Sequence, residues 1–118
     1  MTDKIHVPVN EIMARTVYKV DGLATVREAI TKLVEYGVSS LVVDRRGDQD
    51  EYGMIHVSDI ASKVIADNLS PDRVQVFEIM AKPVLTVPAE MNIRYAIRHL
   101  VEFNRSRAAV VDHQRELV

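Results

Sequence analysis

The sequence predicts an α/β fold of two pseudo-symmetric β-α-β-β-α units, and an internal repeat is the first observation that predicts it. Residues 9–39 match residues 76–106 without a gap at a spacing of 67 positions, with 14 identities over 31 positions. After one inserted residue, Leu-Val-Val-Asp at 41–44 aligns with Ala-Val-Val-Asp at 109–112. The second observation is that both copies show the same order of strand-like and helix-like apolar spacing. Self-similarity at a fixed period indicates one structural unit used twice.

The first copy opens with signals for a turn, a strand and an amphipathic helix. A helical turn is expected over residues 7–14 and a short strand over residues 16–20. Thr25 is placed to cap the next helix, with Glu28 three residues later as the partner of a capping box. Apolar residues follow at helical spacing, and Gly37 is expected to end the helix in the left-handed conformation.

The rest of the first copy is predicted to form a hairpin followed by a second helix. Strands are expected over residues 40–43 and 52–57, joined by a polar loop. Ser58 is placed to cap a helix that runs to about Asn68. This order of elements defines the unit as β-α-β-β-α.

The second copy follows a linker over residues 69–75, so the predicted boundaries are 1–68 for the first unit and 76–118 for the second. Its elements are a leading turn, a strand over 84–87, a helix over 92–103 and a strand over 108–111. The repeat also places Ile30 and Ile97 at equivalent helical positions, and we expect both side chains to be buried.

The second unit is predicted to be truncated at its C-terminal end. It stops at Leu117-Val118, where the first copy reaches Tyr52-Gly53, so it has no counterpart of residues 54–67. We expect either that the natural chain continues or that this unit lacks its final strand and helix. A unit without them would expose apolar surface and an unpaired sheet edge.

The composition of the chain is that of an ordinary globular protein. Of 118 residues, 47% are hydrophobic and 27% are charged, and 15 basic against 17 acidic side chains give a net charge of -2. No net field therefore attracts nucleic acid or an anionic membrane. There is no cysteine, which excludes disulfides, a thiolate nucleophile and cysteine-based zinc sites. No signal peptide or membrane-spanning run is visible, so we expect a cytoplasmic protein.

Three phrases point to a family. They are Glu-Ile-Met-Ala at 11–14 with its repeat at 78–81, Gly-Val-Ser-Ser-Leu-Val-Val-Asp at 37–44, and Gly-Met-Ile-His-Val-Ser-Asp-Ile at 53–60. In this order, and on a repeated β-α-β-β-α unit, the chain resembles the CBS-domain pair, or Bateman module. The resemblance implies a non-catalytic module that binds adenosine-containing ligands such as AMP, ADP or ATP in clefts between its two units. Such a module regulates a fused or associated protein.

The start of the predicted second helix carries the first candidate ligand residues. Asp59 directly follows a strand, where a carboxylate can accept both ribose hydroxyls and the helix N-terminus favours a nearby phosphate. The resemblance implies that Asp59 binds the ribose, as an Asp at this position does in the family. Without the resemblance, Asp59 is read as an ordinary carboxylate at a helix N-terminus. The family usually has Ser or Thr three residues earlier, where this chain has His56, with Ser58 just before the aspartate. His56 is either a donor to phosphate in its charged form or a partly buried strand histidine.

The resemblance implies that the other unit completes the Asp59 site. Leu85 would cover the adenine, Arg107 would meet the phosphate, and Ser106 and Ala109 would flank Arg107. A second, symmetry-related site would need an aspartate that the second copy lacks. That second site would use Tyr18, Val38, Ser39 and Ser40.

No other motif indicates a catalytic or metal site. The four histidines lack metal-ligand spacing, and no serine stands in a Gly-x-Ser-x-Gly setting. Arg94, Arg98 and Arg105 form a local basic cluster with Arg107. Interspersed glutamates and the scarcity of aromatic residues favour a solvated face over nucleic-acid binding.

Two functions are therefore open. One is a regulatory module that binds an adenine nucleotide and needs no other cofactor. The alternative is a structural interaction module of the same fold with empty clefts, which the replacement by His56 and the incomplete second site favour. Either module is expected to be a homodimer, with Val64 and Ile65 of the second helix facing the partner, and to act on a regulated partner protein or fused domain.

Overall fold

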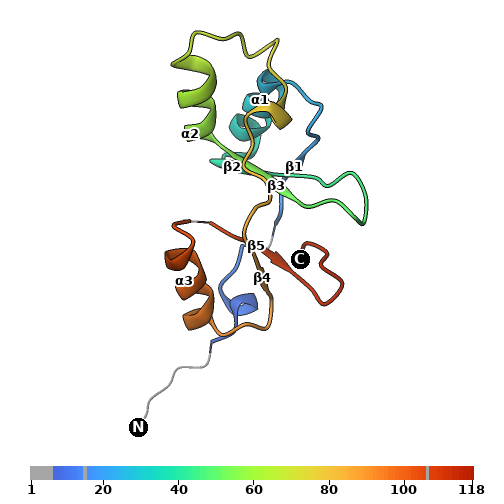
Figure 1. The fold of residues 1–118 in the computed structure, drawn as a ribbon, viewed down its shortest axis with the longest axis vertical. Coiled ribbons are helices and arrows are strands. Elements are labelled where there is room, and N and C mark those ends of the chain that lie inside the picture. Colours follow the sequence, from blue (N-terminus) through green and yellow to red (C-terminus); the bar gives the residue numbers. More distant parts are fainter. Residues whose placement is uncertain (1–6, 15, 106) are drawn as a thin grey trace. The chain divides into compact units, whose positions relative to one another are not determined.

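The chain divides into two compact units that interleave along the sequence. The structure is a computed structural model that describes residues 7–14, 16–105 and 107–118 (Figure 1). Unit 1 combines the residues up to Val17 with Leu85–Val118, and unit 2 is Tyr18–Val84. The boundaries proposed from the sequence, at 1–68 and 76–118, divide the chain by repeat. The compact units divide it differently, because the segment that leads the first repeat belongs to unit 1 and the segment that leads the second repeat, residues 76–84, belongs to unit 2.

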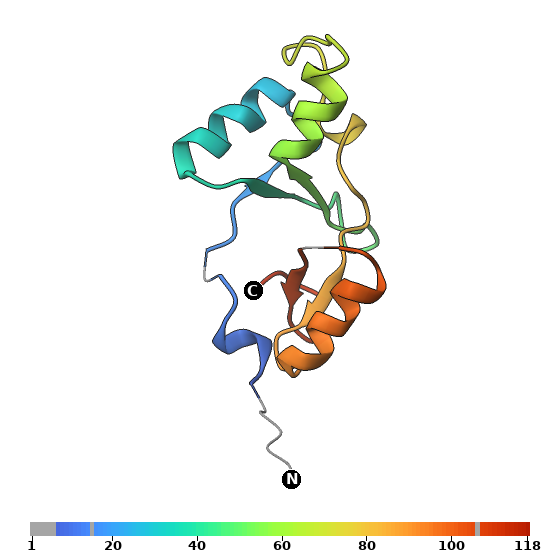
Figure 2. The same cartoon turned by 90° about the vertical axis from the view of Figure 1, so that its left-hand side faces the viewer.

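Unit 2 is a three-stranded sheet covered by two helices. Its elements are β1 (Lys19–Val20), α1 (Val26–Tyr36), β2 (Ser40–Val43), β3 (Gly53–His56), α2 (Val57–Ile60), the π-helical turn η2 (Ala61–Ile65) that continues α2, and the 3-10 turn η3 (Val76–Glu78). Strand β2 lies in the middle, parallel to β1 and antiparallel to β3. Figures 1 and 2 show α1 and α2 on the same face of this sheet. The predicted β-α-β-β-α order is confirmed for this unit.

The core of unit 2 is aliphatic and lies between the sheet and the two helices. Leu41 of β2 and Ile55 of β3 are 1% and 0% exposed, and Val64 of η2 is 0% exposed. The same cluster contains side chains from every other element of the unit: Val20, Val26, Ala29, Leu33, Val43, Ile60, Val74, Val76 and Ile79. Val64 was expected to face a partner, and that expectation is wrong because η2 turns this side chain onto α1 and the sheet.

Both predicted ends of α1 are present. The Thr25 hydroxyl accepts a hydrogen bond from the Glu28 backbone N–H at 3.2 Å, which satisfies one of the free donors of the first turn. Gly37 ends the helix with φ of 65°, in the left-handed region that costs glycine least.

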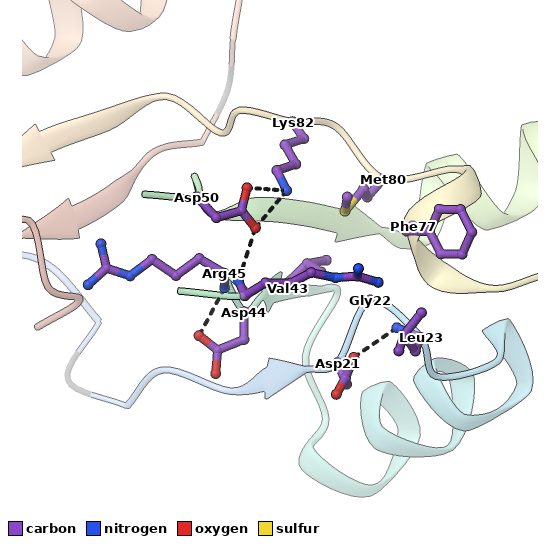
Figure 3. Close-up of a pocket in the computed structure, with 11 residues that line it drawn as sticks. Asp21, Gly22, Leu23, Val43, Asp44, Arg45, Asp50, Phe77, Met80 and Lys82 are labelled. Carbon is purple, nitrogen blue, oxygen red and sulfur yellow. Dashed lines mark hydrogen bonds and ion pairs between the residues drawn. The ribbon is translucent and has the colours of Figure 1, made fainter. Parts of the chain in front are cut away.

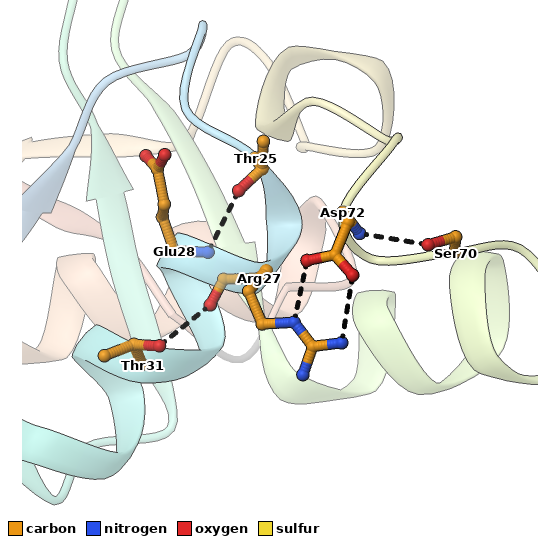
Figure 4. A network of polar contacts seen from close by, with 6 residues as sticks. All are labelled: Thr25, Arg27, Glu28, Thr31, Ser70 and Asp72. Carbon is orange, nitrogen blue, oxygen red and sulfur yellow. Dashed lines mark hydrogen bonds and ion pairs between the residues drawn. The ribbon is translucent and has the colours of Figure 1, made fainter.

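The segment expected to be a linker packs against the start of α1. The Val26 backbone N–H donates to the Val74 carbonyl at 2.8 Å. In Figure 4, the Arg27 guanidinium donates two hydrogen bonds to the Asp72 carboxylate, at 2.9 and 3.3 Å. These bonds hold the pKa of Asp72 below its usual value and raise that of Arg27. Residues 69–75 are therefore part of unit 2 in space, although they lie outside both sequence repeats.

Gly53 is required by a close backbone approach. The segment after η3 runs along the outer edge of β3, where Met54 and Ala81 exchange two backbone hydrogen bonds of 2.9 Å. A Cβ atom on Gly53 would lie 2.9 Å from the Met80 sulfur and 3.1 Å from the Ala81 carbonyl oxygen. The glycine therefore allows the segment after η3 to lie close against the outer edge of β3.

Unit 1 is a smaller version of the same arrangement. It contains η1 (Val9–Glu11), β4 (Thr86–Pro88), α3 (Ile93–Glu102) and β5 (Ala109–Val111). Strands β4 and β5 are parallel, as β1 and β2 are. After β5 the chain turns back, and Leu117 forms an antiparallel bridge to Val111. The core is correspondingly small, with Val9, Val87 and Ala96 at its centre.

The repeat is visible in the backbone as well as in the sequence. Asn92 caps α3 through its side chain, as Thr25 caps α1. Asn104 follows α3 with φ of 54°, at the position that corresponds to Gly37. Asparagine is the residue after glycine that best tolerates this conformation, so the same helix end is built from two residue types.

The expectation that Ile30 and Ile97 would both be buried is wrong for Ile97. Ile30 is partly buried against the core of unit 2, whereas Ile97 is 51% exposed. The difference follows from the helix formed by α2 and η2, which places Ile60 and Val64 beside α1. Among the described residues of unit 1, no helix follows β5 to cover α3 in the same way.

Replacing Ile55 by Ala should lower the free energy of unfolding of unit 2 by about 2–5 kcal/mol, because the substitution leaves a cavity at a fully buried position of β3. Val101→Ala, at a position that is 75% exposed, is the control and should change stability by less than about 0.5 kcal/mol. Chemical denaturation followed by circular dichroism measures both. Equal effects of the two substitutions would contradict this description of the core.

Candidate functional site

One end of the sheet of unit 2 gathers most of the predicted ligand residues. Strands β1 and β2 begin at this end and β3 finishes there, because Ser40 pairs with His56 and the Val42 backbone N–H donates to the Tyr18 carbonyl. The Val57 backbone N–H donates to the Ser39 carbonyl at 2.9 Å, which holds the start of α2 against the start of β2. Polar groups from three separate segments therefore meet at one sheet end.

Asp59 lies in the first turn of α2 with its carboxylate turned back toward the strand. Its Oδ2 accepts the His56 backbone N–H at 2.9 Å, and its Oδ1 lies 3.8 Å from the Lys63 ammonium. The side chain is 24% exposed, so solvent reaches part of the carboxylate. A carboxylate has about four acceptor positions, and these contacts leave it able to accept further hydroxyl donors.

His56 caps α2, and the predicted cap at Ser58 is wrong. The Ser58 backbone N–H donates to His56 Nδ1 at 3.1 Å, and the Ser58 hydroxyl oxygen lies 2.8 Å from the same nitrogen. Together with the bond from the His56 N–H to Asp59, this forms a reciprocal capping box. Histidine is not among the preferred N-cap residues, which is why the sequence pointed to the nearby serine instead.

Residues assigned from the sequence to two separate sites meet at this sheet end. Ser39 and Ser40 adjoin His56 and were predicted to serve the second, symmetry-related site. Val38, predicted for the same second site, is partly buried against the core. Tyr18 is also partly buried, and its ring stacks on that of Tyr36 with centroids 4.2 Å apart.

Unit 1 holds the remaining predicted residues. The Ala109 backbone N–H donates to the Leu85 carbonyl at 2.8 Å, so these two residues are neighbours on paired strands. Ala109 is 5% exposed, and Arg107, two residues earlier, is exposed. Ser106 lies outside the residues that the structure describes. The roles expected for these four residues stay predictions.

The opposite end of the β2–β3 hairpin carries a pocket that the sequence did not predict. Its volume is about 470 Å3, and it shares no residue with the predicted ligand site (Figure 3). It is lined by Asp21, Gly22, Leu23, Val43, Asp44, Arg45, Arg46, Asp50, Phe77, Met80 and Lys82. The lining comes from the turn before α1, the end of β2 with the hairpin loop, and η3 with the segment after it, so no contiguous motif marks it.

A departure from the internal repeat is the sequence signal that could have found this pocket. Leu23 and Phe77 are 53% and 45% exposed, yet both are large and apolar. Their counterparts in the repeat are Glu90 and Asn10, which are polar as exposed positions usually are. The pocket therefore draws on residues of both copies, and its two exposed apolar side chains belong to unit 2 without apolar counterparts in unit 1.

An ion pair forms part of the pocket wall. The Lys82 ammonium lies 2.8 Å from Asp50 Oδ1 and donates to Oδ2 at 3.0 Å. This hydrogen bond, with those from the Arg46 and Glu51 backbone N–H groups, lowers the pKa of Asp50 to about 2. The carboxylate is therefore ionised at every pH at which the protein is expected to work.

The described residues contain neither a metal-binding cluster nor a membrane-spanning helix. Across residues 7–14, 16–105 and 107–118, no three histidine, aspartate or glutamate side chains gather so that they could hold a metal ion. Within these ranges, no helix is long and apolar enough to cross a membrane.

Comparison with known protein families matches the CBS domain over residues 9–66 and 76–118. An uncharacterised protein of Methanopyrus kandleri is 30% identical over 112 residues. The match covers 95% of this chain and 57% of that protein, so the chain spans little more than half the length of this relative.

Solved structures with the same fold include proteins from bacteria and archaea. A hexameric CBS-CP12 protein from bloom-forming cyanobacteria superposes with a TM-score of 0.89 at 33% identity, covering 97% of this chain and 62% of that one. A CBS domain protein of Pyrobaculum aerophilum, complexed with AMP, superposes with a TM-score of 0.82 at 23% identity, covering 95% and 84%.

Lys82→Met should raise the pKa of Asp50 from about 2 toward its ordinary value of 3.8, because the hydrogen bond from Lys82 is the largest cause of the shift. The return should be partial, since two backbone N–H groups still donate to the carboxylate. A carboxyl titration followed by carbon NMR measures the shift.

The sign of the accompanying stability change follows from the same shift. A carboxyl whose pKa is lower in the folded chain adds stability above its unfolded pKa, and this stability is lost as pH falls from about 4 toward 2. The difference in stability between the wild type and Lys82→Met should therefore shrink over that window. Asp72 is the internal control and should titrate identically in both proteins. An unchanged Asp50 midpoint in the variant would contradict the assignment.

Proposed function

Because this chain belongs to the CBS-domain family, we propose that it is a regulatory module that binds an adenosine-containing nucleotide at the Asp59 end of unit 2. The observation that carries the proposal is the geometry of Asp59. A carboxylate held by a capping box and partly exposed to solvent is suited to accept the two hydroxyls of a ribose.

The neighbouring groups support the same class of ligand. Ser39 and Ser40 bring two hydroxyl side chains to the same sheet end as Asp59, and Ser58 brings a third. We propose that Ser39 and Ser40 act with Asp59 in one site, and not in a separate one. Leu85, Ser106, Arg107 and Ala109 keep their proposed roles toward the adenine and the phosphate.

The relatives support a ligand-binding role without identifying the ligand. The Pyrobaculum aerophilum protein of the same fold was solved with AMP, and a CBS domain pair of another relative was solved with S-adenosylmethionine and 5'-methylthioadenosine. All three ligands contain an adenosine group with both ribose hydroxyls free. AMP and adenosine are therefore the first compounds to test on this chain.

A second function is favoured by exposed apolar side chains on the covering helices of unit 2. Val34 of α1 is 77% exposed and Ile65 of η2 is 58% exposed. Large apolar residues exposed on neighbouring helices are typical of contacts between protein chains. We propose that the chain forms a homodimer through these helices. An interaction module that binds no ligand would need only this ability to dimerise.

Asp59→Asn should weaken AMP binding by at least about tenfold, because the variant loses the charge that strengthens hydrogen bonds to the ribose, each worth about 1.5–3 kcal/mol. Isothermal calorimetry on the wild type and the variant measures the change. Asparagine has the same shape and can still accept the His56 N–H, so the start of α2 should be kept.

The matched control is Glu28→Gln, which neutralises an exposed carboxylate in the first turn of α1. It should leave AMP affinity unchanged. If the wild type and Asp59→Asn bind AMP equally, or if the wild type binds neither AMP nor adenosine, the nucleotide proposal fails and the interaction module becomes the better account.

Val34→Glu should shift the protein from dimer to monomer, because it places a charge in the proposed apolar contact. Light scattering at several protein concentrations measures the mass of each species. Glu28→Lys, at an exposed position of α1 that is not a neighbour of Val34 on the helix surface, is the control and should remain dimeric. A wild type that is monomeric at high micromolar concentration would overturn this proposal.

A further inference from the structure

We infer that His56 acts as a neutral positioning residue for Asp59, and not as a cationic ligand of phosphate. The inference rests on the proposed function for its effect on binding, but its geometry belongs to unit 2 alone. It reverses the pH dependence that a charged histidine at a phosphate would give.

The hydrogen bonds of His56 fix which ring nitrogen carries a proton. The Ser58 backbone N–H can only donate, and it points at His56 Nδ1 from 3.1 Å. Nδ1 must therefore present a lone pair, which places the ring proton on Nε2. The Ser58 hydroxyl, 2.8 Å from Nδ1, is then also a donor to the same nitrogen. A charged imidazole carries protons on both nitrogens and cannot accept either bond.

The same cap positions the carboxylate that is proposed to bind ribose. The His56 backbone N–H donates to Asp59 Oδ2 at 2.9 Å, and the His56 ring accepts from the Ser58 N–H, so both side chains belong to one capping box. When the ring takes up a proton, the Ser58 N–H loses its acceptor and the first turn of α2 loses a fixed end. The position of Asp59 then depends on a weaker constraint.

Two charged side chains of the same helix lie close to this turn. Asp59 accepts the His56 backbone N–H, and Lys63 lies 3.8 Å from the other Asp59 oxygen. On β2, the strand partner of His56 is the uncharged Ser40. Lys63 is itself held by a hydrogen bond to the Ile79 carbonyl at 3.1 Å, so its charge stays beside Asp59. We attribute the effect of pH on this turn to the acceptor role of His56 Nδ1.

The two roles for His56 predict opposite binding curves. If the neutral ring positions Asp59, both adenosine and AMP should bind more weakly at about pH 5.5 than at about pH 8, by up to about fivefold if binding requires the whole N-cap hydrogen bond. If the charged ring meets the phosphate, AMP should instead bind more tightly at the lower pH and adenosine should not respond. Calorimetry with both compounds at both pH values separates the two roles.

His56→Asn and His56→Ser test the positioning role directly. Both side chains accept a hydrogen bond from the first turn of a helix and neither titrates, so both variants should bind adenosine as the wild type does at the higher pH. Both should also lose the dependence on pH. His113→Asn is the control, since His113 is 81% exposed and belongs to unit 1, and it should keep the wild-type dependence.

A measurement without ligand keeps this inference separable from the proposed function. Nitrogen NMR should find the neutral His56 ring protonated at Nε2, and the Ser58 amide resonance should follow the titration of that ring. If neither compound binds but the Ser58 amide follows His56, the nucleotide proposal fails and the capping role stands. If His56 titrates while the Ser58 amide stays unchanged, or if AMP alone tightens at low pH, the inference is overturned.

Discussion

The pairing of β2 with β3 is the constraint on which the rest of unit 2 depends. Residue by residue, Ser40 to Val43 oppose His56 to Gly53, and this register puts Leu41 and Ile55 into the core together. A slip of one residue would turn the side chains of one strand to the other face of the sheet, so Leu41 and Ile55 would no longer face the core together. The same register brings the end of β3, and hence the start of α2, beside the start of β2. The strand register that forms the core therefore also positions the candidate site.

The capping box joins this scaffold to the proposed chemistry. Asp59 satisfies the His56 backbone N–H, and the His56 ring satisfies that of Ser58, so two unpaired donors of the helix end are used at once. A group that serves the fold in this way is held in one orientation before any ligand arrives. Such preorganisation lowers the entropic cost of binding, because the carboxylate does not have to be ordered by the ligand.

Local signals predicted the parts of the fold that local chemistry decides. Thr25 and Gly37 mark the ends of α1 because a hydroxyl acceptor and a left-handed glycine are each specific to a helix end. The exposure of Ile97 could not be predicted from the repeat, since it depends on whether another helix covers α3. The cap at His56 was not predicted because the apolar pattern indicated a strand that continues to residue 57. The pocket beside Phe77 was missed because three distant segments form it.

Amide chemical-shift mapping during a titration with AMP is the sharpest test of the proposal that adenosine ligands bind at the Asp59 end of unit 2. The shifted resonances in unit 2 should cluster at Ser39, Ser40 and residues 56–59. Those of the hairpin pocket around Asp50 and Phe77 should stay in place, because that pocket lies at the other end of β2 and β3. Shifts confined to the pocket, or none anywhere in unit 2, would rule out binding at Asp59.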